Sequence, residues 1–394
     1  MRFLLLFLPL FLLATPILND IKQKEFSYDE KFAIEDSKDT EKSWINPIML
    51  QYNYSKDNSL ESVKTTNELL SVSVNQPVFK SGAIYYSIKY AKHLKNYNLL
   101  NIKMQRRNLI KEALDLAYQY RIALLNKKIL DLEIKNSMID IEKKKEEFLN
   151  GVGDSTLLDN AILKLNSQKL SLVDLDQTLS DLRYSFANIS SLDIKTIQLP
   201  VFKLISKKRF LNENLSYLSQ MLQKKVKYDL YKMQKGNQLL SVSLNASYNH
   251  QKIRYSPSSM MFQNNTTDFY KIGFSVNLPI SANASNKIEK AKIDYLKSAL
   301  LIKDKRDSLI RNYESIIKKI KFIEKKIAIY NENKKIYDNL IASTKDSLKA
   351  GNVTTLDLQI LQNSKKTIDY QIEILKLQKQ RLLLELYYQT QIKL

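Results

Sequence analysis

The sequence predicts a mostly α protein with internal duplication, in which long antiparallel coiled-coil helices are joined to four strands of a membrane β-barrel. Three observations predict this fold class. A glycine-centred turn occurs twice, a strand-to-helix junction also occurs twice at nearly the same spacing, and helix breakers are scarce. With only 6 Gly and 7 Pro among 394 residues, most of the chain is expected to form very long helices.

Two repeated motifs mark a duplicated unit. The pattern G-x-x-T-x-L-D occupies residues 153–159 and 351–357, so its copies are 198 residues apart. Its glycine permits the positive φ that ends a helix, its Thr can cap the next helix, and its Asp falls in the first turn of that helix. Ser-Val-Asn-x-Pro occupies residues 73–77 and 275–279, which are 202 residues apart. Two markers with nearly one offset predict two copies of a strand-rich segment, a long helix, a tip and a return helix.

The N-terminus reads as a secretory signal peptide over residues 1–14. Arg2 precedes an apolar run at residues 3–13, which is too short to span a membrane as a helix. Residues 15–46 are polar and charged and are expected to form an N-terminal arm. No later stretch approaches the ~18 apolar residues of a membrane helix, so we expect an exported protein whose membrane insertion uses strands.

Residues 47–79 and 239–280 are each predicted to form a pair of β-strands. Apolar and Ser/Asn residues alternate there, and Lys271 is the single charge within the alternating runs. A soluble sandwich would show the same alternation, but the near absence of charge favours membrane strands with a polar side facing a lumen. The alternating runs are Ile48–Tyr54, Leu70–Asn75, Leu240–Asn249 and Tyr270–Leu278, and polar loops are expected at residues 55–67 and 253–267.

Aromatic residues gather near the ends of these strands. We interpret them as a belt at the membrane interface, where amphipathic rings are enriched, although packing between strands would also account for some of them. The five residues are Tyr52, Tyr54, Tyr248, Phe269 and Tyr270.

Residues 80–190 and 281–394 are predicted to form two helical hairpins. Each outgoing helix has about 67 residues and would be about 100 Å long at ~1.5 Å per residue. Apolar residues recur along both at steps of three and four, which is the period of a coiled-coil seam. The seam of the second outgoing helix is Tyr313, Ile316, Ile320, Ile323, Ile327, Tyr330, Tyr337, Ile341, Thr344 and Leu348, and that of the first is Leu109, Ala113, Leu116, Tyr120, Ala123, Leu130, Ile134 and Ile141.

The return helices, near residues 156–189 and 355–391, are shorter than the outgoing helices, so each outgoing helix needs further helix beside it. Residues 191–238 are predicted to form a linker or equatorial segment that includes a helix at residues 214–235. We assign this helix to the first outgoing helix. The sequence shows no comparable partner for the second.

Composition disfavours several function classes. The formal net charge of +21 comes from Lys interleaved with Glu and Asp, without a compact basic and aromatic patch, so no nucleic-acid partner is expected. His93 and His250 are the only histidines and Cys is absent, so no metal site is expected. Without a nucleophile constellation or a phosphate-binding loop, the sequence predicts neither an enzyme nor a cofactor.

Five segments carry a resemblance to a known family. They are Val74–Phe79 and Val276–Ile280, which lead into the long helices, the tips at Gly153 and Gly351, and the helix-to-strand segment Leu239–Ser243. In this order they resemble the TolC-type outer membrane efflux protein family, over nearly everything from residue 46 to the end. The resemblance implies a homotrimer in which each protomer gives four strands to one 12-stranded barrel in the lipid bilayer, while the helices form an α-barrel.

By this resemblance the protein lies in the cell outer membrane of a double-membraned bacterium and extends into the periplasm. It is expected to be the exit duct of a tripartite efflux pump or a type I secretion system, which passively transports small molecules or polypeptides. Its expected partners are a periplasmic adaptor (membrane fusion) protein and an inner-membrane transporter. The alternative is an exported coiled-coil structural or adhesive protein without a pore.

The resemblance also implies two kinds of site at the tips. Asp159 and Asp357 are expected at the pore constriction, where three copies of each would attract cations and raise one another's pKa. The simpler interpretation is a first-turn Asp that favours the helix dipole, and both can hold. Where some members carry a Tyr and an Arg that lock the closed pore, this chain has Leu348 and Val353, so its closing contacts should differ. The residues expected to contact the adaptor are Gly151, Gly153, Asp154, Ser155, Gly351, Asn352, Val353 and Thr354.

Overall fold

The computed structural model describes residues 17–60, 63–257 and 263–392. The predicted signal peptide therefore lies outside the described residues. The described chain forms two compact units. The helical unit contains the residues up to Ser27, Lys103–Leu215 and the residues from Asp307 onward, and the strand unit contains Tyr28–Ile102 and Ser216–Arg306.

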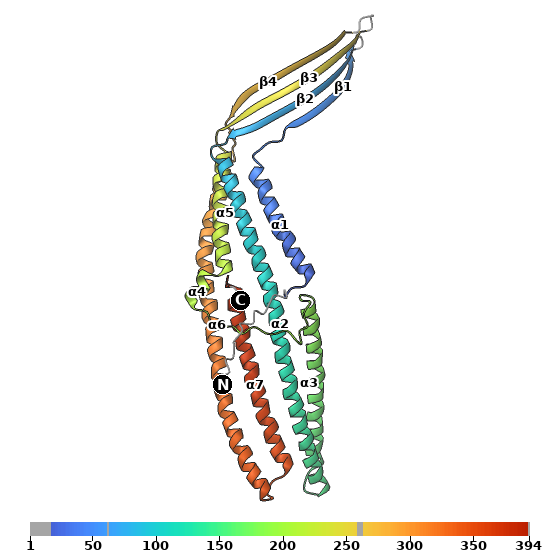
Figure 1. Ribbon diagram of the computed structural model, residues 1–394, viewed down its shortest axis with the longest axis vertical. Coiled ribbons are helices and arrows are strands. Elements are labelled where there is room, and N and C mark those ends of the chain that lie inside the picture. The colour runs from blue at the N-terminus through green and yellow to red at the C-terminus, as the bar shows by residue number, and fades with distance from the viewer. Residues whose placement is uncertain (1–16, 61–62, 258–262, 393–394) are drawn as a thin grey trace, which may run out of the picture. The chain divides into compact units, whose positions relative to one another are not determined.

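The strand unit contains a four-stranded antiparallel sheet in the order β1-β2-β3-β4 (Figure 1). Its strands are β1 (Met49–Leu60), β2 (Val63–Phe79), β3 (Ser241–Pro257) and β4 (Gln263–Asn277). The four predicted strands are therefore confirmed. Because β1 and β4 each have one paired neighbour, no other strand of the described residues covers either edge of the sheet.

The two predicted polar loops are wrong. Residues 55–67 and 253–267 are mostly strand, and the pairing continues as far as Leu60↔Val63 and Tyr255↔Gln263. The strands are consequently 12 to 17 residues long. These stretches contain several Thr, and β-branched Thr favours strands, so their polar composition was a poor sign of a loop.

The two faces of the sheet differ in polarity, as predicted. One row of the apolar face, taken across the four strands, consists of Leu50, Val72, Tyr248 and Tyr270. These four side chains are between 37% and 77% exposed in the single chain. Lys271 lies on the other face, paired with Ser247. Phe269 shares that polar face, because successive residues of a strand point to opposite sides, and it does not join the other four predicted belt residues.

Four helices contribute to the strand unit, namely α1 (Asp20–Lys42), α2 (Ala83–Leu149), α5 (Leu215–Asn237) and α6 (Ala284–Lys349). α2 packs against both α1 and α5. The Ser37 hydroxyl of α1 donates a hydrogen bond to the Ala91 carbonyl at 3.1 Å. On the side of α5, His93 Nδ1 lies 2.5 Å from Asp229 Oδ2.

α5 makes two further contacts that fix its position. Lys227 forms an ion pair with Asp294 of α6 at 3.4 Å. Near its C-terminal end, Gly236 packs directly on the start of α2, where a Cβ at residue 236 would lie 2.7 Å from the Ala83 nitrogen. Only glycine allows this approach, so α5 is held between α2 and α6.

In the helical unit, α2 and α6 pack with α3 (Ser155–Ala187) and α7 (Thr355–Tyr388), and α4 (Lys207–Asn212) is a short connecting helix. Contacts give the order α3, α2, α7, α6 (Figure 1). They are Lys127 with Asp176 at 2.5 Å, Asn136 with Asn363 at 2.7 Å, and Lys334 with Asp369 at 2.6 Å. α7 has a helix on each side, whereas α3 packs along α2 and stays largely exposed.

The seam predicted on the second outgoing helix is confirmed as its packed face. Tyr313, Ile316 and Ile320 are buried, and the other seam residues of α6 are half-buried. No helix among the described residues is long and apolar enough to cross a membrane.

Each return helix ends next to the start of another helix. α3 ends next to the start of α1, where Asn19 N–H donates to the Ile189 carbonyl at 3.0 Å. α7 ends next to the start of α5, where Leu215 N–H donates to the Gln389 carbonyl at 2.9 Å.

The assignment of the helix at residues 214–235 to the first outgoing helix is borne out by the contacts of α5 with α2, which are His93 with Asp229 and Gly236 with Ala83. The packing of α1 against α2 and the contact of α5 with α6 were missed in the sequence analysis.

Candidate functional site at the hairpin tips

Both outgoing helices end in the same turn. Gly151 and Gly351 have φ of +74° and +76°, in the left-handed region that favours glycine. In both copies the residue after the glycine donates its N–H to the carbonyl five residues back at 3.0 Å. This combination is the Schellman motif, which satisfies carbonyls that the end of a helix leaves free.

The two tips align differently from the repeated motif. The counterpart of Gly351 is Gly151 and not Gly153, so the copies are 200 residues apart at the tips. Gly153 lies after the turn and has no positive φ. The second glycine, two residues after Gly151, led the motif to be aligned on Gly153, so every residue aligned after it was displaced by two positions.

The N-caps show the consequence. Thr354 caps α7 as predicted and forms a capping box with Asp357, in which Asp357 N–H donates to Thr354 Oγ1 at 3.3 Å and Thr354 N–H donates to Asp357 Oδ2 at 3.0 Å. The prediction is wrong for α3, which is capped by Asp154 while Thr156 donates its N–H to that carboxylate at 3.0 Å. These hydrogen bonds from Thr156 hold the pKa of Asp154 below its usual value.

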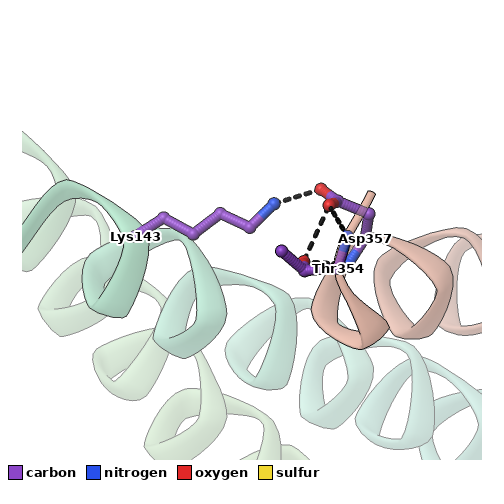
Figure 2. Close-up of polar contacts among 3 residues, drawn as sticks. All are labelled: Lys143, Thr354 and Asp357. Carbon is purple, nitrogen blue, oxygen red and sulfur yellow. Dashed lines mark hydrogen bonds and ion pairs between the residues drawn. The ribbon is translucent and has the colours of Figure 1, made fainter. Parts of the chain in front are cut away.

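The second tip is also tied to the outgoing helix of the first hairpin (Figure 2). Lys143 of α2 forms an ion pair with Asp357, and the two side chains are 29% and 36% exposed. The Lys143 ammonium, followed by the N–H and hydroxyl of Thr354, lowers the pKa of Asp357 to about 2. Within one chain this shift is opposite in direction to the rise expected from neighbouring carboxylates.

The other predicted site residues lie apart from this contact. Asp159 is exposed on α3 and makes no hydrogen bond or ion pair with any side chain that the structure describes. Leu348 and Val353 are half-buried. Within residues 17–60, 63–257 and 263–392 there is no cluster of three His, Cys, Asp or Glu side chains able to hold a metal ion.

Lys143 is the functional candidate that the sequence analysis missed. Its partner Asp357 is 214 residues away, and the hairpin repeat says nothing about which helix of one hairpin touches the other. The three consecutive lysines at residues 143–145, just before the tip, are the only local sign of a role. Such a run is equally typical of a solvated helix face.

The first tip exposes a group of large apolar side chains, which we call the apolar tip surface. It consists of Phe148, Leu149, Val152 and Leu157, whose exposed fractions are 44%, 71%, 83% and 52%. Large apolar side chains gathered on an exposed surface are typical of a site that binds another protein.

Comparisons with known proteins identify the fold. No family model and no curated protein matches the sequence. Among solved structures, the Campylobacter jejuni CmeC outer membrane channel superposes with a TM-score of 0.74 at 15% identity, over 95% of this chain and 83% of that one. The outer membrane protein VceC from Vibrio cholerae gives 0.72 at 12% identity, over 94% and 93%. The open state of the Neisseria gonorrhoeae MtrE outer membrane channel gives 0.67 at 13% identity, over 93% and 85%.

These likenesses extend over nearly the whole of this chain and of the channels. The resemblance to TolC-type proteins is therefore confirmed at the level of the fold. At 10–15% identity the individual site residues cannot be carried over from the channels, so their roles rest on the geometry of this chain.

Proposed function

We propose that the protein is an outer-membrane channel that serves as the exit duct of a tripartite efflux pump or a type I secretion system. The observation that carries the proposal is the sheet, whose apolar face is exposed and whose two edges are open. Open edges cannot face lipid, because unpaired backbone groups find no partner there. Three copies would close a barrel of twelve strands and remove every edge.

Exposed stripes on two helices support a closed ring of copies. α3 and α6 lie at the two ends of the order α3, α2, α7, α6, so each has a side that no other helix of the described residues covers. Each exposes large apolar residues at spacings of three, four, seven or eleven residues, which suits coiled-coil packing. They are Leu163, Leu170, Val173 and Tyr184 on α3, and Phe322, Ile329, Ile336 and Leu340 on α6. Packing of α3 from one copy on α6 of the next is a head-to-tail contact, which closes into a ring.

The apolar tip surface supports a contact with a periplasmic adaptor. A helical hairpin of such a partner would bury Leu149 and Val152, which are 71% and 83% exposed. Burying two side chains of this size contributes about 3 kcal/mol or more. The inner-membrane transporter would then be reached through the adaptor.

The contact between Lys143 and Asp357 supports a gate at the second tip. With the pair formed, the second hairpin is held against the first, and one carboxylate per chain is neutralised. If the second hairpin swings away, the pair breaks and three copies of Asp357 become available to passing cations, as in the charged rings of other pores. Asp159 would add a further ring at the first tip.

Planar-bilayer recording and membrane fractionation test the proposal. We expect heat-modifiable trimers in the outer-membrane fraction and stepwise ion conductance from the purified protein. Val242→Asp and Phe274→Asp should prevent assembly, because a charge on the lipid-facing side costs a few kcal/mol. Ser243→Asp, on the polar face, is the matched control and should assemble with altered conductance only. Soluble, non-conducting chains that tolerate all three changes would favour the structural or adhesive alternative.

A further inference from the structure

Four of the five Lys and Arg residues of the sheet lie on its apolar face, toward the β1–β2 and β3–β4 connections, and Lys271 lies on the polar face. Lys252 shares a cross-strand row with Tyr54, and Arg254 and Lys56 occupy the next row out. Thr66 of β2 pairs with both Lys56 and Arg254, so it belongs to their row. Lys64 is two residues from Thr66 on the same strand and therefore points to the same face. We call Lys56, Lys64, Lys252 and Arg254 the basic strand surface.

The opposite face of the same stretch is different. On its polar side, this outer part of the sheet carries Asp57 as its only charge among the described residues. Lysines that served only to keep strand ends in water would be expected on both faces. The segregation of all four cations to the apolar face therefore indicates a role directed toward whatever surrounds that face.

The acidic groups on this face leave most of the positive charge uncompensated. Glu68 forms an ion pair with Arg254 at 3.1 Å. Asp268 lies 2.6 Å from His250 Nδ1 and accepts a hydrogen bond from the Tyr248 hydroxyl at 3.0 Å. Lys56, Lys64 and Lys252 form no ion pair with any described side chain. Three ammonium groups are therefore available to an external anion.

We propose that the basic strand surface binds the phosphomonoester groups of an anionic lipid of the lipid A class in the outer leaflet. This inference rests on the proposed membrane barrel, in which the apolar face contacts lipid. Tyr54 marks the interface, and the row of Lys56 and Arg254 lies about 7 Å further along the strands at ~3.4 Å per residue. That distance places the cations within the layer of headgroups, which is several ångströms thick.

The spacing of the cations fits a doubly charged phosphate. Neighbours on adjacent strands and diagonal neighbours are separated by about 5–8 Å, a gap that the long side chains of Lys and Arg can bridge. Two or three cations can therefore converge on one group. A phosphomonoester carries up to two negative charges and several acceptor oxygens, so it is a better match than the single charge of a phosphodiester.

Lipid binding to the purified trimer tests this inference. Native mass spectrometry in a neutral detergent would count the diphosphorylated lipid A molecules retained at each lipid concentration. Lys56→Gln combined with Lys252→Gln should weaken retention about 25-fold, because each cation near an anionic headgroup contributes about fivefold. Both lysines lack an ion pair among the described side chains, so the exchange should leave the fold intact.

The matched control is Lys164→Gln combined with Lys271→Gln. It removes the same charge from the exposed face of α3 and from the polar face of the sheet, and retention should be unchanged. Lipid A without its phosphates should bind the wild-type trimer weakly. Its retention should equal that of intact lipid A on the variant with Lys56→Gln and Lys252→Gln. Equal retention by variant and wild type, equal retention of phosphatidylglycerol, or displacement of lipid A by equimolar inorganic phosphate would each overturn the proposal.

Conductance recorded on the same preparations separates this inference from the proposed function. Lys56→Gln combined with Lys252→Gln alters no residue assigned to the pore gate, to the tips or to the polar face of the sheet, so this variant should conduct as the wild type does. If the trimers conduct but do not retain lipid A, only the proposed lipid binding by the basic strand surface is wrong. A protein that neither forms trimers nor conducts counts against the channel itself.

Discussion

The two hairpin tips share a backbone and differ in what they expose. Both close around a left-handed glycine with the same hydrogen-bond pattern. At matched positions the side chains are apolar at the first tip and mostly polar at the second. The pairs, 200 residues apart, are Phe148 and Leu348, Leu149 and Lys349, Val152 and Asn352, and Leu157 and Asp357. The turn is therefore the same at both tips, while the exposed side chains around it differ.

The position of each tip in the helix order explains the difference. α3 has α2 as its neighbour, so the first tip is free to present the apolar tip surface to another protein. α7 lies between α2 and α6, and its tip is held by the ion pair of Lys143 with Asp357. We infer that the first tip binds the partner and that the second tip holds the closed state. Each of the following predictions tests one side of this division.

The largest effect is expected for partner binding at the first tip. Leu149→Asp combined with Val152→Asp should weaken adaptor binding at least 30-fold, because loss of a central apolar contact typically costs about 2 kcal/mol or more. Lys349→Asp combined with Asn352→Asp, at the matched positions of the second tip, is the control and should have a smaller effect. Affinity of the purified adaptor for immobilised channel measures both.

Crosslinking gives an independent measure of the same contact. A cysteine in place of Asn150 should crosslink to the adaptor more efficiently than one in place of Asn352. A cysteine in place of Asn264, near the start of β4, should not crosslink. A stronger reaction at Asn352 than at Asn150 would reverse the roles of the two tips. Reaction at Asn264 alone would reverse the orientation of the whole channel.

The next effect concerns the closed state at the second tip. Lys143→Met removes the partner of Asp357 and should raise single-channel conductance or open probability severalfold, because the second hairpin loses its tie to α2. Lys145→Met, on the exposed side of the same helix, removes the same charge without breaking an ion pair among the described residues and is the control. Unchanged recordings for Lys143→Met would show that the gate lies elsewhere.

The pH dependence of this closed state follows from the lowered pKa of Asp357. The group ionises with a pKa of about 2 when paired, against 3.8 when free, so the pair stabilises the closed tip above the free value. As pH falls from about 4 to about 2, the carboxylate takes up a proton and the contribution is lost. Because the side chain is 36% exposed, solvent screening limits this contribution to about 1 kcal/mol.

Bilayer recordings between pH 7 and pH 3 measure that loss. The conductance of the wild-type channel should stay low and constant from pH 7 to about pH 4 and rise increasingly below it. Asp357→Asn should show raised conductance already at pH 7 and a flat profile. An opening transition near neutral pH that disappears in this variant would instead indicate carboxylates that raise one another's pKa, as first expected from a ring of Asp.

Periodicity made the fold predictable, while the pairing of distant segments did not. The three-and-four spacing along α6 and the alternation of β3 each depend on local sequence, and both were confirmed. The contact of Lys143 with Asp357 and the hydrogen bond from Leu215 N–H to the Gln389 carbonyl depend on how the two halves of the chain meet, which no local sequence pattern shows. The alignment of the two tips was wrong for another reason. The first tip contains two glycines, Gly151 and Gly153, and either could be aligned with Gly351.

The smallest effect is expected for the helix caps. Thr354→Ala removes the hydroxyl that accepts from Asp357 N–H and leaves the Asp357 carboxylate without one of its three donors. Loss of such a cap costs about 1 kcal/mol, so amide exchange in the first turn of α7 should accelerate about fivefold. Asp154→Ala at the matched position should accelerate exchange in α3 less, because its cap lacks the reciprocal bond of the capping box. Hydrogen exchange by mass spectrometry resolves the two tips separately. A larger acceleration for Asp154→Ala than for Thr354→Ala would show that the cap of α3 contributes more to stability than the capping box of α7.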